Sequence, residues 1–422
     1  MKKIKILGML TFLAVFIGNT ALAEQKTELA MGQSVYPPAG GIWKTPPAQG
    51  ALSPLSGKSL KTVVFVTNRD SGDVTVIDAQ TDQIINRVNL ESWVNSHMAM
   101  SMQMGGKKML LVSGTQKNVV YLIDLDNGTA KVVPTGLAPE HFDASPDGHT
   151  AYFANIDGGS ISAVDIMAGK ELARIEGFYE PHGVTFHPTL KKAYIPNLGA
   201  HEVGVIDTVE HKLIKRIAIG ELPKVAALNP DKYLGEIQGI VNVTLTPDGR
   251  YAYAADGDSG QVGVIDTATD EVVKTLQTGE EPWRAYASPD GKWMMIPNNG
   301  DETVTVIDAR KHKVVATLPG GAGMTGINYA LDNRKAYVIA AEDSSVLVYN
   351  LPSFTSKKLV LGKNLALETA ATTPDGKKVY VAASTDNSVY VINAEDDQVK
   401  RIANVGQFPW GVAIMDGQNY CH

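Results

Sequence analysis

A histidine followed by alternating methionines is the clearest metal-binding pattern in this sequence. His97 leads into Met98, Met100, Met102 and Met104, which recur with period two. On a β-strand this spacing places the four thioethers on one face. Thioethers are soft ligands that suit cuprous copper, so His97, Met98 and Met100 could form a copper site. Methionine also fills irregular gaps in protein cores, and packing is the other interpretation of this row.

Further polar side chains stand just before short apolar runs elsewhere in the chain. They are His97, Glu140, His141, His182, Asn242, Trp283, Arg284, Thr325, Glu368 and Trp410. We single out His97, His141, His182, Arg284 and Glu368 as cofactor-binding candidates. Imidazoles, a carboxylate and a guanidinium could together hold a small anionic or metal-containing ligand, if the fold brings the starts of these runs together. Solvation of a water-filled channel is the alternative.

The apolar runs belong to a repeat. Its landmark is a short strand that closes on Asp or Asn and recurs about every 42 residues, with two insertions. The closing residues are Asp78, Asp124, Asp165, Asp207, Asp266, Asp308, Asn350 and Asn393. Each unit contains four strands, which bury their faces only if the units stack radially. The repeat therefore predicts an all-β, eight-bladed β-propeller with four-stranded blades.

Turn motifs support this assignment. The first strand of several units precedes a Pro-Asp-Gly turn, in which Pro sets φ and Gly takes the left-handed position. The first unit lacks such a strand, and residues 408–415 at the other end of the chain supply a spare one. We therefore expect the N- and C-terminal strands to pair and close the ring. Innermost strands start at the channel mouth, which is where the candidate residues would meet.

The remaining segments flank or interrupt the propeller. Residues 1–23 have three lysines, an apolar stretch and Ala21-Leu22-Ala23, which predicts a cleaved signal peptide and a periplasmic location. Residues 24–60 are rich in Gly and Pro and are expected to form an extension beside the propeller, which spans 61–422. Residues 224–239 form the larger insertion, either a lid over the channel or a surface loop.

Composition excludes several classes of protein. The net charge is −7, so nucleic acid is not an expected partner, and no apolar stretch is long enough to span a membrane. Cys421 is the single cysteine, which excludes an internal disulfide and covalent c-type haem attachment. Cys421 and His422 are too few to form a metal site, and we expect the tail after Gly417 to run across the surface. No hydrolase or dinucleotide motif occurs, so we lean away from an enzyme.

Repeat motifs such as KKVYVAASTDNSVYVIN at 377–393 resemble the YVTN family of extracytoplasmic propellers. The first two units, with SHMAMSMQMGGKKMLLVSG, are more narrowly similar to the haem d1 propellers of cytochrome cd1 nitrite reductases and their assembly proteins. That resemblance implies His97 as the axial ligand of a haem d1 iron. PHGVTFHPT similarly implies His182 as a residue on the open face of the iron.

Two functions follow as expectations. The generic repeat favours a binding or scaffold propeller accessory to a redox system, with a periplasmic redox protein or a small catalytic subunit as its partner. The narrower resemblance implies a haem d1-binding oxidoreductase or cofactor-assembly protein. Copper binding is a further alternative.

Overall fold

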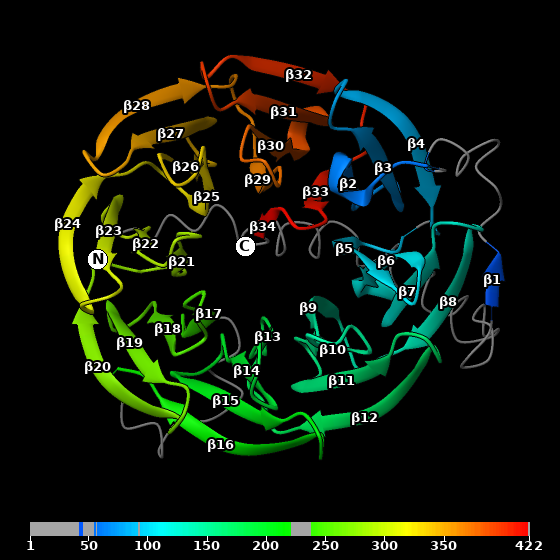
Figure 1. Ribbon diagram of the computed structural model, residues 1–422, viewed down its shortest axis with the longest axis horizontal. Helices are drawn as coiled ribbons and strands as arrows, with labels where there is room; N and C mark the ends of the chain where they lie inside the picture. Colours follow the sequence, from blue (N-terminus) through cyan, green and yellow to red (C-terminus); the bar gives the residue numbers. More distant parts are fainter. Residues whose placement is uncertain (1–41, 45–54, 56, 92, 221–237, 421–422) are drawn as a thin grey trace, which may run out of the picture.

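The structure is a computed structural model that describes residues 42–44, 55, 57–91, 93–220 and 238–420. These residues form eight antiparallel sheets, which stand as blades around a central axis (Figure 1). The described residues contain no α-helix, and their short 3-10 turns are η2 (Leu60–Thr62), η3 (Thr115–Lys117) and η6 (Ser384–Asp386). The predicted all-β, eight-bladed propeller is confirmed.

The first four blades follow the order of the sequence, apart from the innermost strand of blade 1. From the axis outwards, blade 1 contains β33 (Pro409–Ile414), β2 (Val63–Asn68), β3 (Asp73–Asp78) and β4 (Gln83–Asn89). Blade 2 contains β5 (Ser96–Met104), β6 (Lys107–Gly114), β7 (Val119–Asp124) and β8 (Thr129–Pro134). Blade 3 contains β9 (Pro139–Ala144), β10 (Thr150–Asn155), β11 (Ser160–Asp165) and β12 (Lys170–Glu176). Blade 4 contains β13 (Thr185–Phe186), β14 (Lys192–Pro196), β15 (Glu202–Asp207) and β16 (Lys212–Ala218).

The other four blades repeat this arrangement. Blade 5 contains β17 (Ile240–Leu245), β18 (Tyr251–Asp256), β19 (Gln261–Asp266) and β20 (Glu271–Gln277). Blade 6 contains β21 (Tyr286–Ala287), β22 (Trp293–Asn298), β23 (Thr303–Asp308) and β24 (Lys313–Pro319). Blade 7 contains β25 (Met324–Ala330), β26 (Lys335–Ala340), β27 (Ser345–Asn350) and β28 (Thr355–Val360). Blade 8 contains β29 (Leu367–Thr372), β30 (Lys378–Ala383), β31 (Ser388–Asn393) and β32 (Val399–Ala403).

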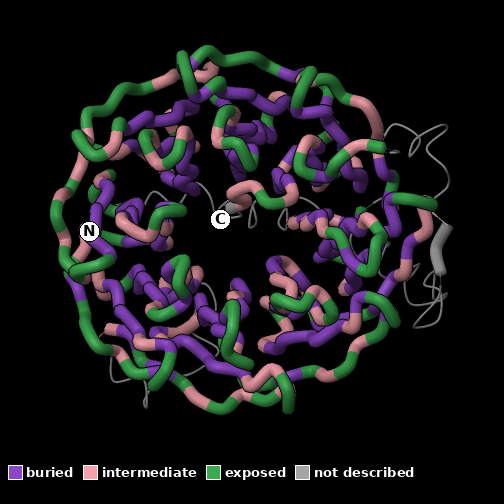
Figure 2. The backbone as a smooth tube through the Cα atoms, in the orientation of Figure 1, coloured by how far each residue is buried: buried purple, intermediate pink, exposed green. Residues whose placement is uncertain are grey.

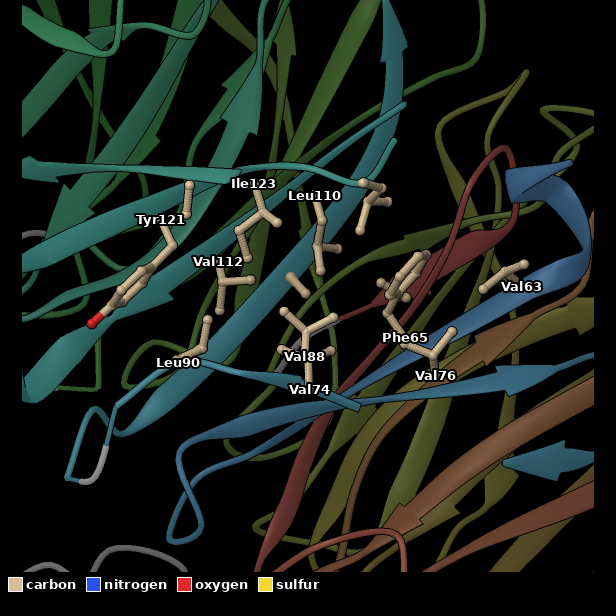
Figure 3. Close-up of a cluster of buried hydrophobic side chains, with 14 of the residues drawn as sticks. Val63, Phe65, Val74, Val76, Val88, Leu90, Leu110, Val112, Tyr121 and Ile123 are labelled. Atoms are coloured by element: carbon tan, nitrogen blue, oxygen red, sulfur yellow. The ribbon is translucent and has the colours of Figure 1, made fainter. Parts of the chain in front are cut away.

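The core lies between the faces of neighbouring blades. The two middle strands of each blade are almost entirely buried, whereas outer strands such as β16 alternate between exposed and partly buried residues (Figure 2). Between blades 1 and 2, Phe65 and Val74 pack with Leu110 and Tyr121 (Figure 3). Each fully buried side chain of this size contributes about 1.5–3 kcal/mol to folding. Apolar burial between the blades therefore holds the ring together.

The ring closes as predicted. β33 from the end of the chain pairs antiparallel with β2 near its start, with Phe65 opposite Ala413. Thr67 reinforces the pairing of β33 with β2, because its hydroxyl accepts a 2.8 Å hydrogen bond from the amide of Gly411. The first and last repeats thus share one blade, and no open edge is left at the junction.

Both flanking segments add a fifth strand to a blade. In the N-terminal extension, β1 (Ile42–Lys44) pairs with the outer strand β8, and Leu55 is buried in the core. At the other end, β34 (Gln418–Tyr420) pairs with the innermost strand β29 and lies near the centre of the ring (Figure 1). The expected surface course of the tail is therefore wrong for residues 418–420. The free edge of β29 offers backbone partners, and Asn419 holds the turn with two hydrogen bonds to Ile414.

Several sequence-based predictions lie outside the described residues. They are the signal peptide, most of residues 24–60, residues 224–237 of the insertion, Cys421 and His422. Within the described part of the chain, we found no helix with the length and apolar character needed to cross a membrane.

Candidate functional site

The candidate residues occupy one equivalent position in successive blades. In seven blades, the first residue of the innermost segment pairs with the last residue of the neighbouring strand, for example Ser96 with Gly114, and in blade 4 Pro181 pairs with Asn197 just after that strand. The residue that follows this pair begins the channel mouth. Around the ring these residues are Trp410, His97, Glu140, His182, Val241, Trp283, Thr325 and Glu368. His141, Asn242 and Arg284 come one residue later.

Bulges re-aim the side chains at this level. In β5 the register shifts so that His97 and Met98 lie opposite Ser113 alone, and in β9 Glu140 and His141 lie opposite Ala154 alone. Adjacent side chains of a regular strand point to opposite faces, and a bulge breaks that alternation. The bulge in β9 is therefore the reason that two consecutive residues can both contribute to the site.

Threonine hydroxyls fix the backbone of the mouth from one blade to the next. Thr67 donates to the carbonyl of His97 at 2.9 Å, and Thr115 donates to the carbonyl of Pro139 at 2.8 Å. In the same way, Thr369 of blade 8 donates to the carbonyl of Trp410 in blade 1 at 2.7 Å. These bonds fix the backbone at and beside the candidate residues through carbonyl groups rather than through side chains.

Three predicted histidines meet at the mouth. The ring centroids of His97 and His141 lie 4.8 Å apart, and those of His141 and His182 lie 4.4 Å apart. Trp410 extends the series, with its ring 5.1 Å from that of His97. The side chains come from blades 1 to 4, so a continuous arc of aromatic and imidazole rings lines this part of the mouth.

His182 is held in one tautomer. Its Nδ1 lies 3.1 Å from the carbonyl oxygen of Val241, and a carbonyl can only accept, so Nδ1 carries the proton. Burial lowers the pKa of His182 to about 4, and the charge of Arg284 acts in the same direction. The ring is therefore neutral at physiological pH, and its Nε2 keeps a lone pair that can bind a metal or accept a proton.

Glu140 stands beside the imidazoles. One ligand atom each from His97, Glu140 and His141 lies within 4.8 Å of the others. Burial and, to a smaller extent, the charge of Asp157 together raise the pKa of Glu140 to about 8. Burial and Asp157 also raise the pKa of Glu180. Carboxyl groups thus cluster near His141, and burial favours their protonated form.

Arg284 and Glu368 extend this arrangement in both directions. Arg284 acts electrostatically on His182. Burial raises the pKa of Glu368, while a 2.5 Å hydrogen bond from Ser384 and the charge of Arg69 oppose that rise. The Arg69 guanidinium also lies 3.4 Å from the ring centroid of Phe408 and 5.5 Å from that of Trp410. Ring contacts therefore join His182, His141, His97 and Trp410, and electrostatic effects connect Arg284 to His182 and Arg69 to Glu368.

The methionine row points elsewhere. Met98, Met100 and Met102 are partly buried and pack against a core cluster that includes Leu111 and Phe142. This placement favours the packing interpretation of the row. Ligation of copper by His97, Met98 and Met100 stays a prediction, which a titration can test.

Sequence reasoning missed part of the site. Arg69, Phe408 and Asp157 were not among the candidates, although each acts on one that was. Arg69 follows directly after β2 and Asp157 lies in the hairpin after β10, so both come from loops after a second strand. A search for charged residues at that repeat position would have found them.

Comparisons with known proteins support one of the two resemblances. The family model of the cytochrome D1 haem domain matches residues 240–412. Dihydro-haem d1 dehydrogenase NirN, solved in complex with DHE, aligns with a TM-score of 0.67 and 15% identity, over 85% of this chain and 76% of that one. No curated protein matched the sequence.

Two other solved structures share the fold. Hydrazine synthase of Kuenenia stuttgartiensis aligns with a TM-score of 0.52 and 20% identity, over 74% of this chain and 96% of that one. A functionally unknown protein from Desulfotomaculum acetoxidans aligns with a TM-score of 0.53 and 16% identity, over 71% and 96%. Together with the domain match, these similarities show that this chain is an eight-bladed propeller resembling the haem d1 propellers.

Proposed function

We propose that this protein is a periplasmic β-propeller that binds a haem d1-type tetrapyrrole at its channel mouth and serves a redox system. The contact series of His97, His141 and His182 carries this proposal. The match of residues 240–412 to the cytochrome D1 haem domain supports the class of cofactor. We propose that it binds the cofactor, or delivers it to a separate periplasmic redox protein, rather than performing turnover itself.

The donor set fits an iron tetrapyrrole. Neutral imidazole is the form that ligates haem iron, and His182 is neutral with its Nε2 lone pair available. Arg69 and Arg284 flank the arc and are suited to pair with the carboxylates of a tetrapyrrole. Trp410 adds an aromatic surface beside His97. When bound, the group would supply redox chemistry and an open iron position for a small anion.

His97 would supply the imidazole that holds the iron of the bound group, and His182 would stand near it as a further imidazole. In the structure the ring of His141 contacts both of these residues. A macrocycle between His97 and His182 would therefore require the His141 side chain to turn aside. In that position, His141 would be an additional imidazole beside the bound group and would no longer lie between His97 and His182.

An absorbance titration tests the proposal. The mature chain, in buffer with a metal chelator, is titrated with haem d1 and with ordinary haem. We expect haem d1 to bind with a Kd below about 10 μM, and His97→Ala to shift the Soret band and weaken retention. His182→Ala should keep the cofactor but change its response to nitrite. If neither tetrapyrrole binds more tightly than about 10 μM, the proposal fails, and the scaffold function remains.

A further inference from the structure

The side of the mouth formed by blades 2 and 3 carries a donor set of its own. His97 Nδ1 or Nε2, a Glu140 carboxylate oxygen and a His141 ring nitrogen lie within 4.8 Å of one another. A metal that binds three ligands at about 2.0–2.2 Å brings their atoms to about 3.0–3.4 Å from each other. Rotations of the three side chains would bring the donor atoms to these shorter distances, while the strands stay in place.

The backbone supports these three side chains. The bulge in β9 lets Glu140 and His141 act from consecutive positions, and the bulge in β5 places His97 across the seam from them. Thr67 and Thr115 hydrogen-bond to the carbonyls of His97 and Pro139, so both strand starts are fixed. A site on rigid strands loses little entropy when its ligand binds.

The surroundings favour a cation at this point. Asp157 acts electrostatically on Glu140 and on Glu180, so three carboxylates share one region. The arginines of the mouth act on other residues, Arg284 on His182 and Arg69 on Glu368. His97 and His141 are only 7% and 6% exposed, so a bound ion would be held largely out of bulk water. Carboxyl groups and imidazoles thus lie together in a buried region, where a bound cation would replace the proton that burial favours on Glu140.

We infer that His97, Glu140 and His141 form a binding site for one divalent first-row transition-metal ion, with open coordination positions towards the channel. Two imidazoles and one carboxylate are a donor set typical of Fe(II) and Zn(II) sites that keep positions for water or a substrate. This inference goes beyond the proposed function, because the ion needs no macrocycle. Both occupants would use His97, so a tetrapyrrole iron and the bare ion would exclude each other.

The test uses the mature full-length chain, stripped with a chelator and free of any tetrapyrrole. Titration with Zn²⁺ and with Co²⁺ should show one equivalent bound, and Co²⁺ should give visible d–d bands of nitrogen and oxygen ligation. Glu140→Gln and His141→Asn should each weaken Zn²⁺ binding by at least about 100-fold, since loss of outer partners alone costs about 10–100-fold. Asp157→Asn should weaken binding by about tenfold, and His149→Asn, at an exposed histidine, should leave it unchanged.

The fluorescence of Trp410 provides a second measurement. It is made on the wild-type protein and so does not depend on whether the ligand variants fold. The Trp410 ring lies 5.1 Å from that of His97, so Co²⁺ in the site should quench Trp410 fluorescence while Zn²⁺ does not. Trp410→Phe should abolish this quenching, which would identify Trp410 as the quenched residue. Absence of Zn²⁺ binding tighter than about 10 μM, unquenched Trp410, or wild-type affinity in Glu140→Gln would each overturn the site. The tetrapyrrole titration is run with chelator present, so either proposal can fail without the other.

Discussion

The hydroxyl of Tyr380 donates a 2.6 Å hydrogen bond to Asp82, across 298 residues of sequence and across the seam between blades 8 and 1. Lys378 donates to the same carboxylate oxygen at 2.8 Å. The same arrangement recurs at two other boundaries between blades. Lys192 and Tyr194 of blade 4 donate to Asp270 of blade 5. Lys335 and Tyr337 of blade 7 donate to Asp397 of blade 8. A side-chain latch thus repeats with the blades and secures the ring closure.

Removal of the latch hydroxyl at the closing seam should destabilise the whole ring. Tyr380→Phe deletes a hydrogen bond to a charged group and should lower the free energy of unfolding by about 1.5–3 kcal/mol. Lys378 and Lys400 still pair with Asp82, so the carboxylate keeps partners. Urea unfolding of the mature chain at neutral pH measures the change.

Tyr337→Phe is the matched control, because it removes the same bond from a seam that does not join the chain ends. Similar losses for both variants would show that the closing seam is as strong as an internal one. An unfolding midpoint of Tyr380→Phe equal to that of the wild type would contradict the latch.

The repeat could be predicted because its signals are local. Asp78, one of the landmark residues, accepts hydrogen bonds from the amides of Gln80 and Thr81 and so shapes the turn after its strand. Turn chemistry of this kind recurs wherever the strand does, and spacing alone then reveals the blades. The blade count, the shared closing blade and the channel-facing positions of the histidines all follow from it.

The contacts within the site depend on the whole ring and could not be predicted in the same way. His141 meets His97 and His182 because bulges and loops at three separate seams aim the rings inwards, and no local pattern specifies a bulge. The course of β34 beside β29 likewise depends on a free strand edge that exists only after the ring has closed. The sequence therefore predicts which residues lie at the channel mouth, but not which of them contact one another.

A buried ion pair between blades 4 and 5 should make stability depend on pH. Nδ1 of His201 donates a 2.8 Å hydrogen bond to Asp256, and His201 is 4% exposed. This bond raises the pKa of His201, burial opposes the rise, and the charge of Asp256 adds to it. The folded protein therefore holds this proton more tightly than the unfolded chain. The stabilisation is complete below the unfolded pKa, about 6.5, and is lost as the pH rises through the folded pKa.

Comparison of the wild type with His201→Gln isolates this contribution from that of the other histidines. The variant should be less stable by about 2 kcal/mol near pH 6, and the gap should narrow at about pH 8.5. Urea midpoints at the two pH values measure it. A gap that stays constant or widens towards alkaline pH would show that the His201 proton does not stabilise the fold.

Leucine substitutions separate the two interpretations of the methionine row. Met98 and Met100 pack against the cluster that contains Leu111 and Phe142, so Leu should fill nearly the same space. The double variant Met98→Leu, Met100→Leu should cost less than about 1.5 kcal/mol in thermal or urea unfolding, because the exchange conserves volume. It removes both thioethers, however, and with them any soft ligation of copper. We expect cuprous copper to bind the wild type and the folded double variant equally. If the wild type binds one equivalent and the variant none, the thioethers are ligands, and the row has a role beyond packing.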